Sequence, residues 1–244
     1  MQCCTFVHYP SDPMQPGPIY FLIPRKCGLF DVCCEGIPQV NYLIDEGMSS
    51  SKGSSAVINY MHHFFSNYGV WETRVDLNCD NCSGQNKNNF VLWYCAWRTM
   101  LKLHHSLDLH FLITGQTKFA PDWCLGLIKQ RFRNTRVNTL SEIAGVVKDS
   151  TVTGGNIQLV GLEDGTVLVE SYGWRQHLTP YFRPLPKLKQ YQHFGFDALS
   201  LVLCSDSVGI RYQLLRNADI LPPIDGLPVQ APPGLDTSRQ TYIF

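Results

Sequence analysis

Short apolar segments with two different periods follow one another along the chain, and their order restricts the fold more than any other feature. Three β-rich segments come first, at 19–23, 28–34 and 40–45. Turn signals rich in proline, glycine and charge separate them, which predicts an antiparallel meander. The next loop contains Ser54 and Ser55, either of which we expect to cap the following helix.

Helical and alternating periods then succeed one another up to residue 148. In chain order we predict a helix at 56–68, a strand at 73–79, a helix at 88–103, a strand at 107–114, a helix at 121–133 and, after Thr139, a helix at 140–148. An antiparallel start joined to parallel βαβ units predicts an α/β fold with one mixed sheet and helices on both faces. By analogy this order is that of the ribonuclease-H-like fold, to which many integrases and transposases belong.

The pattern changes beyond residue 150, where short β-rich segments alternate with loops. The last part is rich in proline, which predicts a chain without regular packing. We therefore expect a ribonuclease-H-like domain at 1–150, a β-rich extension of the same domain at 151–215, and a proline-rich flexible tail at 216–244.

Composition excludes several classes of protein. Twenty basic and twenty acidic residues give a formal charge of zero, so a nucleic-acid surface would have to be a local patch. No secretory signal and no apolar run long enough to span a membrane are present. Ten cysteines without a signal indicate reduced thiols. We expect an intracellular protein, nuclear or cytoplasmic, without a membrane partner or a small-molecule cofactor; its oligomeric state is open.

Two aspartates follow predicted strands. Asp80 comes directly after the strand at 73–79, and Asp122 begins the helix after the strand at 107–114. Carboxylates brought together at the carboxyl edge of a sheet are the hard oxygen ligands that Mg²⁺ prefers. Two such ions would hold the attacking and leaving oxygens of a phosphodiester. The alternative is that Asp80 makes a side-chain turn and that Asp122 favours the start of a helix.

Two segments are candidates for contact with nucleic acid. Between Gly84 and Asn88, Gln85 and Lys87 are suited to phosphate or sugar oxygens at a helix N-terminus, although amides also stabilise tight turns. The second segment, LIKQRFRNTR, clusters cations that suit a phosphate backbone or a solvated helix end. The candidate phosphate-binding cations are Lys87, Lys118, Lys129, Arg131 and Arg133.

Cys79 and Cys82 form a C-x-x-C pair with three interpretations. A zinc half-site would need a second pair at suitable spacing. A redox pair before a helix would use a lowered thiol pKa. The third interpretation is packing, because Cys79 shares the inward parity of Val75 and Leu77. For the tryptophans we expect core positions, at Trp93, Trp97, Trp123 and Trp174.

The chain also resembles a known group of proteins. The segments VHYPSDPMQPGPIYFL, YLIDEG, CDNCSGQNKNNFVLWY and GQTKFAPDWCLGLIKQRFRNTR resemble a family of transposon-derived proteins, most of which are known only as a domain of unknown function. The resemblance covers about residues 7–235. It implies a ribonuclease-H-fold transposase of the acidic-triad type, with ancestral Mg²⁺- or Mn²⁺-dependent DNA cleavage and strand transfer. Asp80 and Asp122 match two acids of the implied triad.

The resemblance also shows departures. Relatives carry a first aspartate before V-H-Y-P, where this chain has Gln2, and a histidine where it has Gln116. A neutral amide is a weak substitute for a carboxylate on a hard cation, so we expect a truncated, impaired copy. Asp31 and Asp45 are spare carboxylates. The alternatives are a non-catalytic module that binds DNA or protein, and a thiol redox protein.

Overall fold

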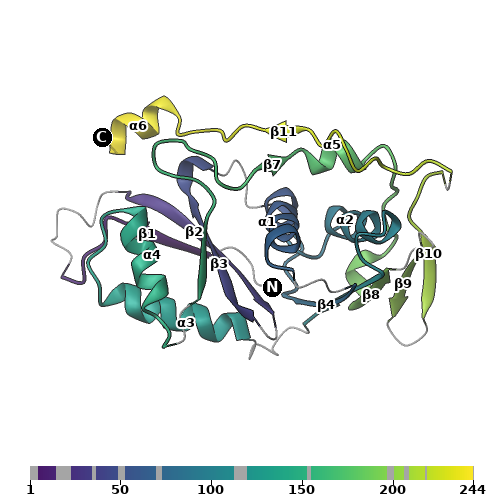
Figure 1. Cartoon of the computed structure of the whole chain (residues 1–244), viewed down its shortest axis with the longest axis horizontal. Helices are drawn as coiled ribbons and strands as arrows, with labels where there is room; N and C mark the ends of the chain where they lie inside the picture. Colours follow the sequence, from purple (N-terminus) through teal and green to yellow (C-terminus); the bar gives the residue numbers. More distant parts are fainter. Residues whose placement is uncertain are drawn as a thin grey trace. The chain divides into compact units, whose positions relative to one another are not determined.

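The chain has a mixed α/β architecture. A computed structural model describes residues 5–14, 23–34, 37–48, 53–69, 73–112, 120–152, 155–196, 201–205, 209–217 and 219–243. Within these ranges it contains six α-helices and sheets with both parallel and antiparallel ladders (Figure 1). None of the helices described is both long enough and apolar enough to cross a lipid bilayer.

Contacts divide the chain into two compact units, each assembled from separate segments. The first unit combines 1–50, 117–169 and 232–244, and the second combines 51–116 and 170–231. This grouping differs from the consecutive segments expected from the sequence, and the consecutive division stays a prediction. Strand pairing explains the difference, because strands near the end of the chain join sheets that begin much earlier.

The first unit contains a four-stranded sheet in the order β1-β2-β3-β6. Its strands are β1 (Thr5–Tyr9), β2 (Arg25–Cys34), β3 (Ile37–Asp45) and β6 (Asn156–Leu159). The first three form an antiparallel meander whose first strand, β1, was not among the predicted strands, and β6 runs parallel to β3. The short 3-10 helix η2 (Glu46–Met48) follows β3. The other helices are α3 (Ala120–Arg133), α4 (Leu140–Lys148) and α6 (Thr237–Ile243).

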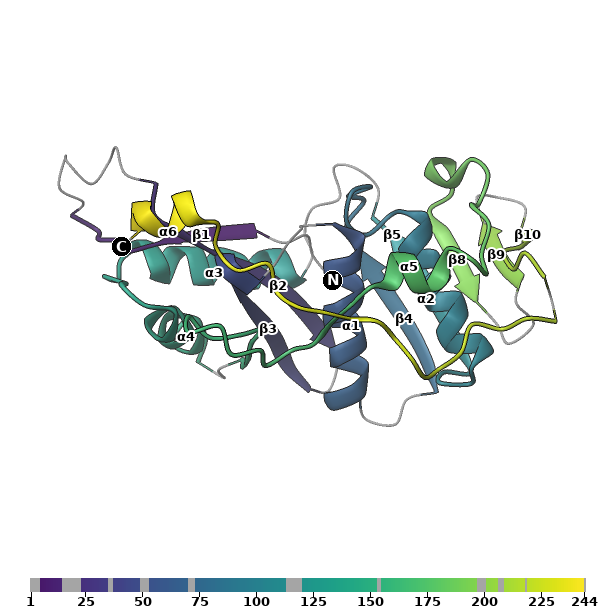
Figure 2. The same ribbon diagram turned by 90° about the horizontal axis from the view of Figure 1, so that it is seen from above.

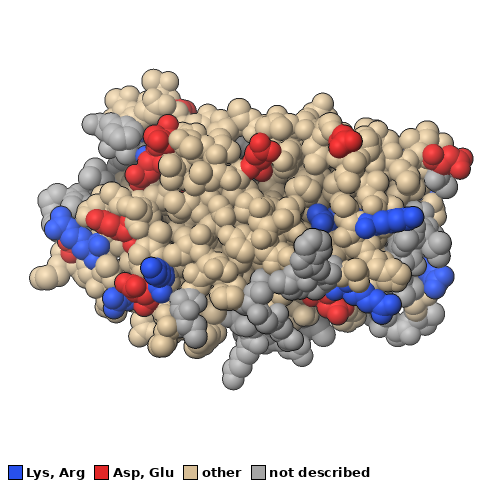
Figure 3. Space-filling model, in the orientation of Figure 1, with Lys and Arg blue, Asp and Glu red and all other residues tan. Residues whose placement is uncertain are grey.

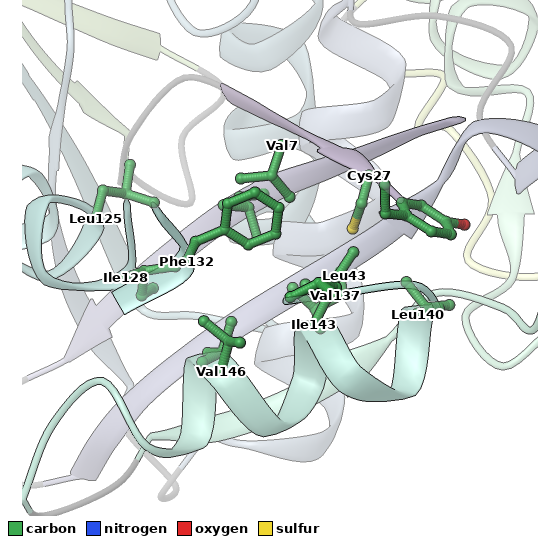
Figure 4. Packing of buried hydrophobic residues seen from close by; sticks show 13 residues of the cluster. Val7, Cys27, Leu43, Leu125, Ile128, Phe132, Val137, Leu140, Ile143 and Val146 are labelled. Atoms are coloured by element: carbon green, nitrogen blue, oxygen red, sulfur yellow. The ribbon is translucent and has the colours of Figure 1, made fainter. Parts of the chain in front are cut away.

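Helices α3 and α4 cover one face of this sheet (Figure 2). Figure 4 shows strand side chains such as Val7 and Leu43 pointing toward Phe132 of α3 and Ile143 of α4. These residues are nine per cent exposed or less, as expected for apolar stripes that remove each other from water. The core of the unit therefore forms where the inward face of the meander meets two amphipathic helices.

The second unit contains a five-stranded sheet in the order β10-β9-β8-β5-β4, in which β4 and β5 are parallel and the other neighbours antiparallel. The strands are β4 (Arg74–Cys79), β5 (Ser106–Phe111), β8 (His193–Phe196), β9 (Leu201–Ser205) and β10 (Ile210–Gln213). The helices are α1 (Ser54–Asn67), α2 (Asn89–Met100), α5 (Trp174–Leu178) and the 3-10 helix η3 (Leu188–Gln190).

An aromatic cluster joins the helices of the second unit. Trp97 of α2 and Trp174 of α5 are at most one per cent exposed, and their rings meet edge to face with centroids 5.5 Å apart. Asn59 of α1 accepts hydrogen bonds at Oδ1 from Trp174 Nε1 (2.7 Å) and from the backbone N–H of Tyr172 (3.0 Å). This single amide satisfies two donors that would otherwise be buried unpaired.

The predicted order of elements is confirmed from α1 to α4. The strands do not form the single sheet predicted, because they are divided between a four-stranded and a five-stranded sheet. Helix α4 begins after Thr139 as predicted, and the Thr139 hydroxyl caps it by accepting from Glu142 N (3.2 Å). The cap predicted at Ser54 or Ser55 is wrong: Gly53 holds the N-cap position in an extended conformation. Most of the predicted strand at 19–23 lies outside the described residues.

The proline-rich segment makes regular contacts, which differs from the flexible tail expected there. In the second unit, Pro223 O accepts from Trp97 Nε1 (3.3 Å), and β11 (Val229–Gln230) pairs with β7 (Ser171–Tyr172). In the first unit, Arg239 of α6 pairs with Glu46 at 2.9 Å. A proline lacks an N–H donor but keeps its carbonyl acceptor, so a proline-rich segment can still be fixed by donors around it.

Candidate functional site at the β4–α2 junction

The junction between β4 and α2, residues Asp80–Asn88, begins at the carboxyl end of a parallel strand pair. Cys79 of β4 lies opposite Phe111 of β5 at the end of that ladder, and Asp80 follows directly. Asp80 is half-buried. The aspartate therefore lies at the strand exit predicted from the sequence, where α/β sheets commonly place functional groups.

Hydrogen bonds hold the Asp80 carboxylate within a tight turn. Its Oδ1 atom accepts from the backbone N–H of Cys82 (3.2 Å) and from Asn86 Nδ2 (2.7 Å). Cys82 O in turn accepts from the backbone N–H groups of three following residues, at 2.9 to 3.2 Å. The turn interpretation of Asp80 is thus correct locally, and the same bonds fix the carboxylate at the strand exit.

The other amides of the junction start helix α2. Asn88 Oδ1 accepts from the backbone N–H of Phe90 (3.0 Å) and of Val91 (3.2 Å), while its Nδ2 donates to Gln85 O (2.9 Å). Asn is a preferred N-cap residue because it satisfies these otherwise unpaired donors. Asn86 is fully buried, and within the described part of the chain its Oδ1 has no hydrogen-bond partner.

Lys87 lies inside the second unit and not on its surface. Only four per cent exposed, it donates from Nζ to Lys189 O (3.2 Å) and Gln192 Oε1 (3.1 Å). Burial lowers the pKa of the Lys87 ammonium. This geometry favours a structural role and differs from the phosphate contact predicted for it. Gln85 is half-buried beside it.

Asp122 and the basic cluster belong to α3 in the first unit. Asp122 is exposed in the first turn, where a negative charge favours the helix. Since Asp80 belongs to the second unit, each aspartate is described only within its own unit. Arg131 and Arg133 are exposed in the last turn, and Lys129 is half-buried. Lys118, Gln116 and Gln2 lie outside the described residues.

The structure tests the burial predicted for Cys79 and for Trp123. Cys79 is fully buried, as its inward parity predicts, and burial raises the pKa of its thiol to about 11. This is the opposite of the lowered pKa that a reactive thiol requires, so the geometry gives no support to redox chemistry there. The core position predicted for Trp123 is wrong, because this side chain is 66% exposed on α3.

The two spare carboxylates lie on the inward face of the four-stranded sheet. Asp45 is fully buried and accepts from Arg25 Nε (2.8 Å), Arg25 Nη2 (2.6 Å), Tyr9 OH (2.5 Å) and Gly47 N (3.0 Å). It is therefore fully engaged in holding β1, β2 and β3 together.

Asp31 is a further candidate residue, for which the sequence predicted no role beyond that of a spare carboxylate. It is fully buried on β2, and neither of its oxygens has a hydrogen-bond partner among the described residues. Burial raises the pKa of the Asp31 carboxyl to about 7, against smaller opposing effects of Gln39 and Lys129. The Nε2 atom of Gln39 donates one hydrogen bond to Asn41 Oδ1 (2.9 Å). The available signal was parity, since Asp31 alternates inward with the buried Leu29.

Comparison with known proteins gives one match. A family model described as a domain of unknown function (DUF7869) matches residues 35–201, which is more than half of the chain. The chain belongs to this family. No curated protein and no solved structure matches it. All predicted site residues of this DUF7869 chain lie within the matched segment, whereas Asp31 and Arg25 precede it.

The DUF7869 chain thus presents two separate groups of candidate residues. The β4–α2 junction holds Asp80 and the buried Asn86, while α3 carries Asp122 and exposed cations. Among the residues described, no group of three or more His, Cys, Asp or Glu side chains is placed to hold a metal ion. Any metal bound within the described part of one unit would therefore need other ligands as well.

Proposed function

We propose that this chain derives from a ribonuclease-H-like transposase with metal-dependent DNA cleavage and strand transfer, and that its activity is impaired. The observation that carries the proposal is Asp80, a carboxylate fixed by two hydrogen bonds at the exit of a parallel strand. The order of elements from the meander through α3 supports the ribonuclease-H-like part. The division of the strands between two sheets does not support it.

The donor atoms of the β4–α2 junction fit Mg²⁺ or Mn²⁺ in type. Asp80 offers a carboxylate, and the adjacent Asn86 offers a buried carbonyl oxygen without a described partner. Both are hard oxygen donors. Asp80 would hold the ion, and a bound ion would activate water or a 3′-hydroxyl for attack on a phosphodiester. With Gln2 in place of the expected third acid, metal binding is weakened.

Cleavage of supercoiled plasmid tests the proposal. We expect negligible cleavage by the chain as it stands and a gain of at least about tenfold in Gln2→Asp with Mg²⁺ or Mn²⁺, because a lost carboxylate ligand is restored. Adding Asp80→Asn should remove this gain, whereas adding Asp149→Asn, which alters an exposed carboxylate at the end of α4, should leave it. A Gln2→Asp chain that never cleaves would contradict the proposal.

The second candidate function is DNA binding without cleavage. Arg131 and Arg133 are exposed at one end of α3, and Trp123 is exposed near the other. Exposed cations track a phosphate backbone, and an exposed aromatic ring stacks on bases. Figure 3 shows acidic and basic side chains interspersed on the face that it draws, so this helix would act as a local contact and not as part of a large basic surface.

Salt-dependent binding tests this second candidate. Arg131→Ala/Arg133→Ala should reduce the slope of log Kd against log salt concentration by about 2, since each phosphate contact contributes about 1. The matched control is Lys148→Ala, an exposed cation in the last turn of α4 in the same unit, which should leave the slope unchanged. Fluorescence anisotropy with a labelled duplex measures both. Equal slopes in all three chains would exclude α3 as the contact.

A further inference from the structure

The five-stranded sheet of the second unit has one polar and one apolar face. Along β5, buried apolar residues such as Leu109 alternate with partly exposed polar residues, and β4 and β8 repeat this alternation of more buried and more exposed side chains. A sheet with one solvated face shows this alternation. The polar residues of neighbouring strands therefore share a surface that solutes can reach.

Two histidines meet on this polar face. His110 of β5 lies directly opposite His193 of β8, so both side chains project to the same side. The neighbouring residue Phe111 donates its N–H to Gln192 O (2.8 Å), which makes His110 and His193 a non-hydrogen-bonded pair, the type with the closer side chains. Their Nδ1 atoms are 2.8 Å apart.

Carboxylates surround this histidine pair. His110 Nε2 lies 3.7 Å from Asp76 Oδ1, and Asp76 lies opposite Asp108 across the β4–β5 ladder. Like charges directly opposite each other destabilise a sheet, and a cation nearby would offset that repulsion. Gly195, opposite Asp108 on β8, contributes no side chain that could cover the group. The Asp76 side chain is 75% exposed and that of His110 35% exposed, so an ion has access from solvent.

We propose that His110 and His193 form a binding site for a divalent transition-metal ion of the zinc, nickel and copper class. The two Nδ1 atoms are the protein ligands, and Asp76 orients His110 from its other ring nitrogen. Imidazole nitrogen suits these ions better than it suits Mg²⁺ or Ca²⁺. Since no set of three suitable side chains is placed for a metal in the described part of the chain, water or another molecule takes the remaining positions.

The spacing of the two nitrogens suits a shared ion. Metal–nitrogen bonds of about 2.0 to 2.1 Å place two cis nitrogen ligands about 2.9 Å apart at a right angle and about 3.4 Å apart in a tetrahedron. The observed 2.8 Å is close to the first value. Ligation through Nδ1 also leaves the proton on Nε2, where His110 faces the Asp76 carboxylate, the arrangement that commonly fixes a metal-bound imidazole.

A Ni²⁺ titration of the full chain, with cysteines kept reduced, tests the site. Histidine side-chain NMR signals should show His110 and His193 broadening together, before the other histidines, as one equivalent is added. His110→Gln and His193→Gln should each weaken Ni²⁺ binding more than tenfold, and Asp76→Asn about tenfold, as loss of an outer partner does. The matched control is His105→Gln, an exposed histidine of the same unit, which should bind Ni²⁺ with unchanged affinity.

The alternative to a metal site is that the two imidazoles only form a hydrogen bond with each other and bind no ligand. It predicts that the two signals do not broaden together and that either glutamine variant keeps the affinity of the parent chain. Either result would overturn the proposal. These side chains are on a solvated face, so the variants should fold, and far-ultraviolet circular dichroism checks that they do.

Discussion

Replacing Asp31 with asparagine should raise the free energy of unfolding by roughly 3 to 4 kcal/mol at pH 8 and change it little near pH 4. The carboxyl is fully buried without a described hydrogen-bond partner, and burial raises its pKa to about 7 from an ordinary value of 3.8. Each pKa unit corresponds to about 1.4 kcal/mol, so a shift of this size makes the ionised form costly in the folded state.

The direction of the pH dependence follows from proton binding. Between about pH 4 and pH 7 the folded chain keeps a proton on Asp31 that the unfolded chain releases, so the parent protein loses stability as pH rises through this range. Above pH 7 the Asp31 carboxyl is ionised in both the folded and the unfolded chain, and the free energy of unfolding falls no further from this cause. The asparagine variant has no such group, so its free energy of unfolding should not decline between pH 4 and pH 7 from this cause.

Urea unfolding of both chains at pH 4.5 and pH 8 measures the difference. Asp149→Asn alters an exposed carboxylate in the same unit and should keep the pH dependence of the parent chain. If Asp31→Asn shifted stability equally at both pH values, or lowered it at pH 8, the carboxyl would not be the unpaired buried acid described above.

Replacing Arg25 with methionine should lower the free energy of unfolding by about 3 to 5 kcal/mol, the usual cost of leaving one buried charge uncompensated. Arg25 makes a bidentate pair with the fully buried Asp45, at 2.6 and 2.8 Å. Without it, the carboxylate keeps, among the residues described, the Tyr9 hydroxyl and the Gly47 N–H. Adding Asp45→Asn should recover part of the loss, because it removes the stranded charge.

Arg136→Met provides the matched comparison in the same unit. Its side chain is 72% exposed and its Nε atom lies 3.6 Å from Asp12 Oδ2, so its loss should cost below about 1 kcal/mol. Thermal or urea unfolding of the two variants measures how much stability is lost with the Arg25–Asp45 pair and with the Arg136–Asp12 pair. Similar costs for Arg25→Met and Arg136→Met would show that burial does not set the strength of the Asp45 pair.

Local signals in the sequence predicted part of the local structure. The helix expected after Thr139 begins at Leu140, where the Thr139 hydroxyl accepts from Glu142 N. The inward parity of Cys79 likewise predicted its burial. In both cases the deciding interactions lie within a few residues of each other along the chain.

Features that depend on distant partners could not be predicted in this way. Lys87 looked like a surface cation, yet its ammonium is bound by Lys189 O and Gln192, about a hundred positions later. The pairing of β3 with β6 and of β5 with β8 divides the strands between two sheets, although each strand alone has an ordinary pattern. His110 and His193 meet only because of that second pairing.

The central claim is that the Asp80 carboxylate is a ligand of a divalent metal ion, and Mn²⁺ titration followed by water-proton relaxation tests it most directly. The experiment is best run in a His110→Gln/His193→Gln chain, so that the imidazole pair contributes nothing. Asp80→Asn is then added. We predict saturable Mn²⁺ binding that this substitution abolishes. No binding, or binding that Asp80→Asn retains unchanged, would contradict the claim.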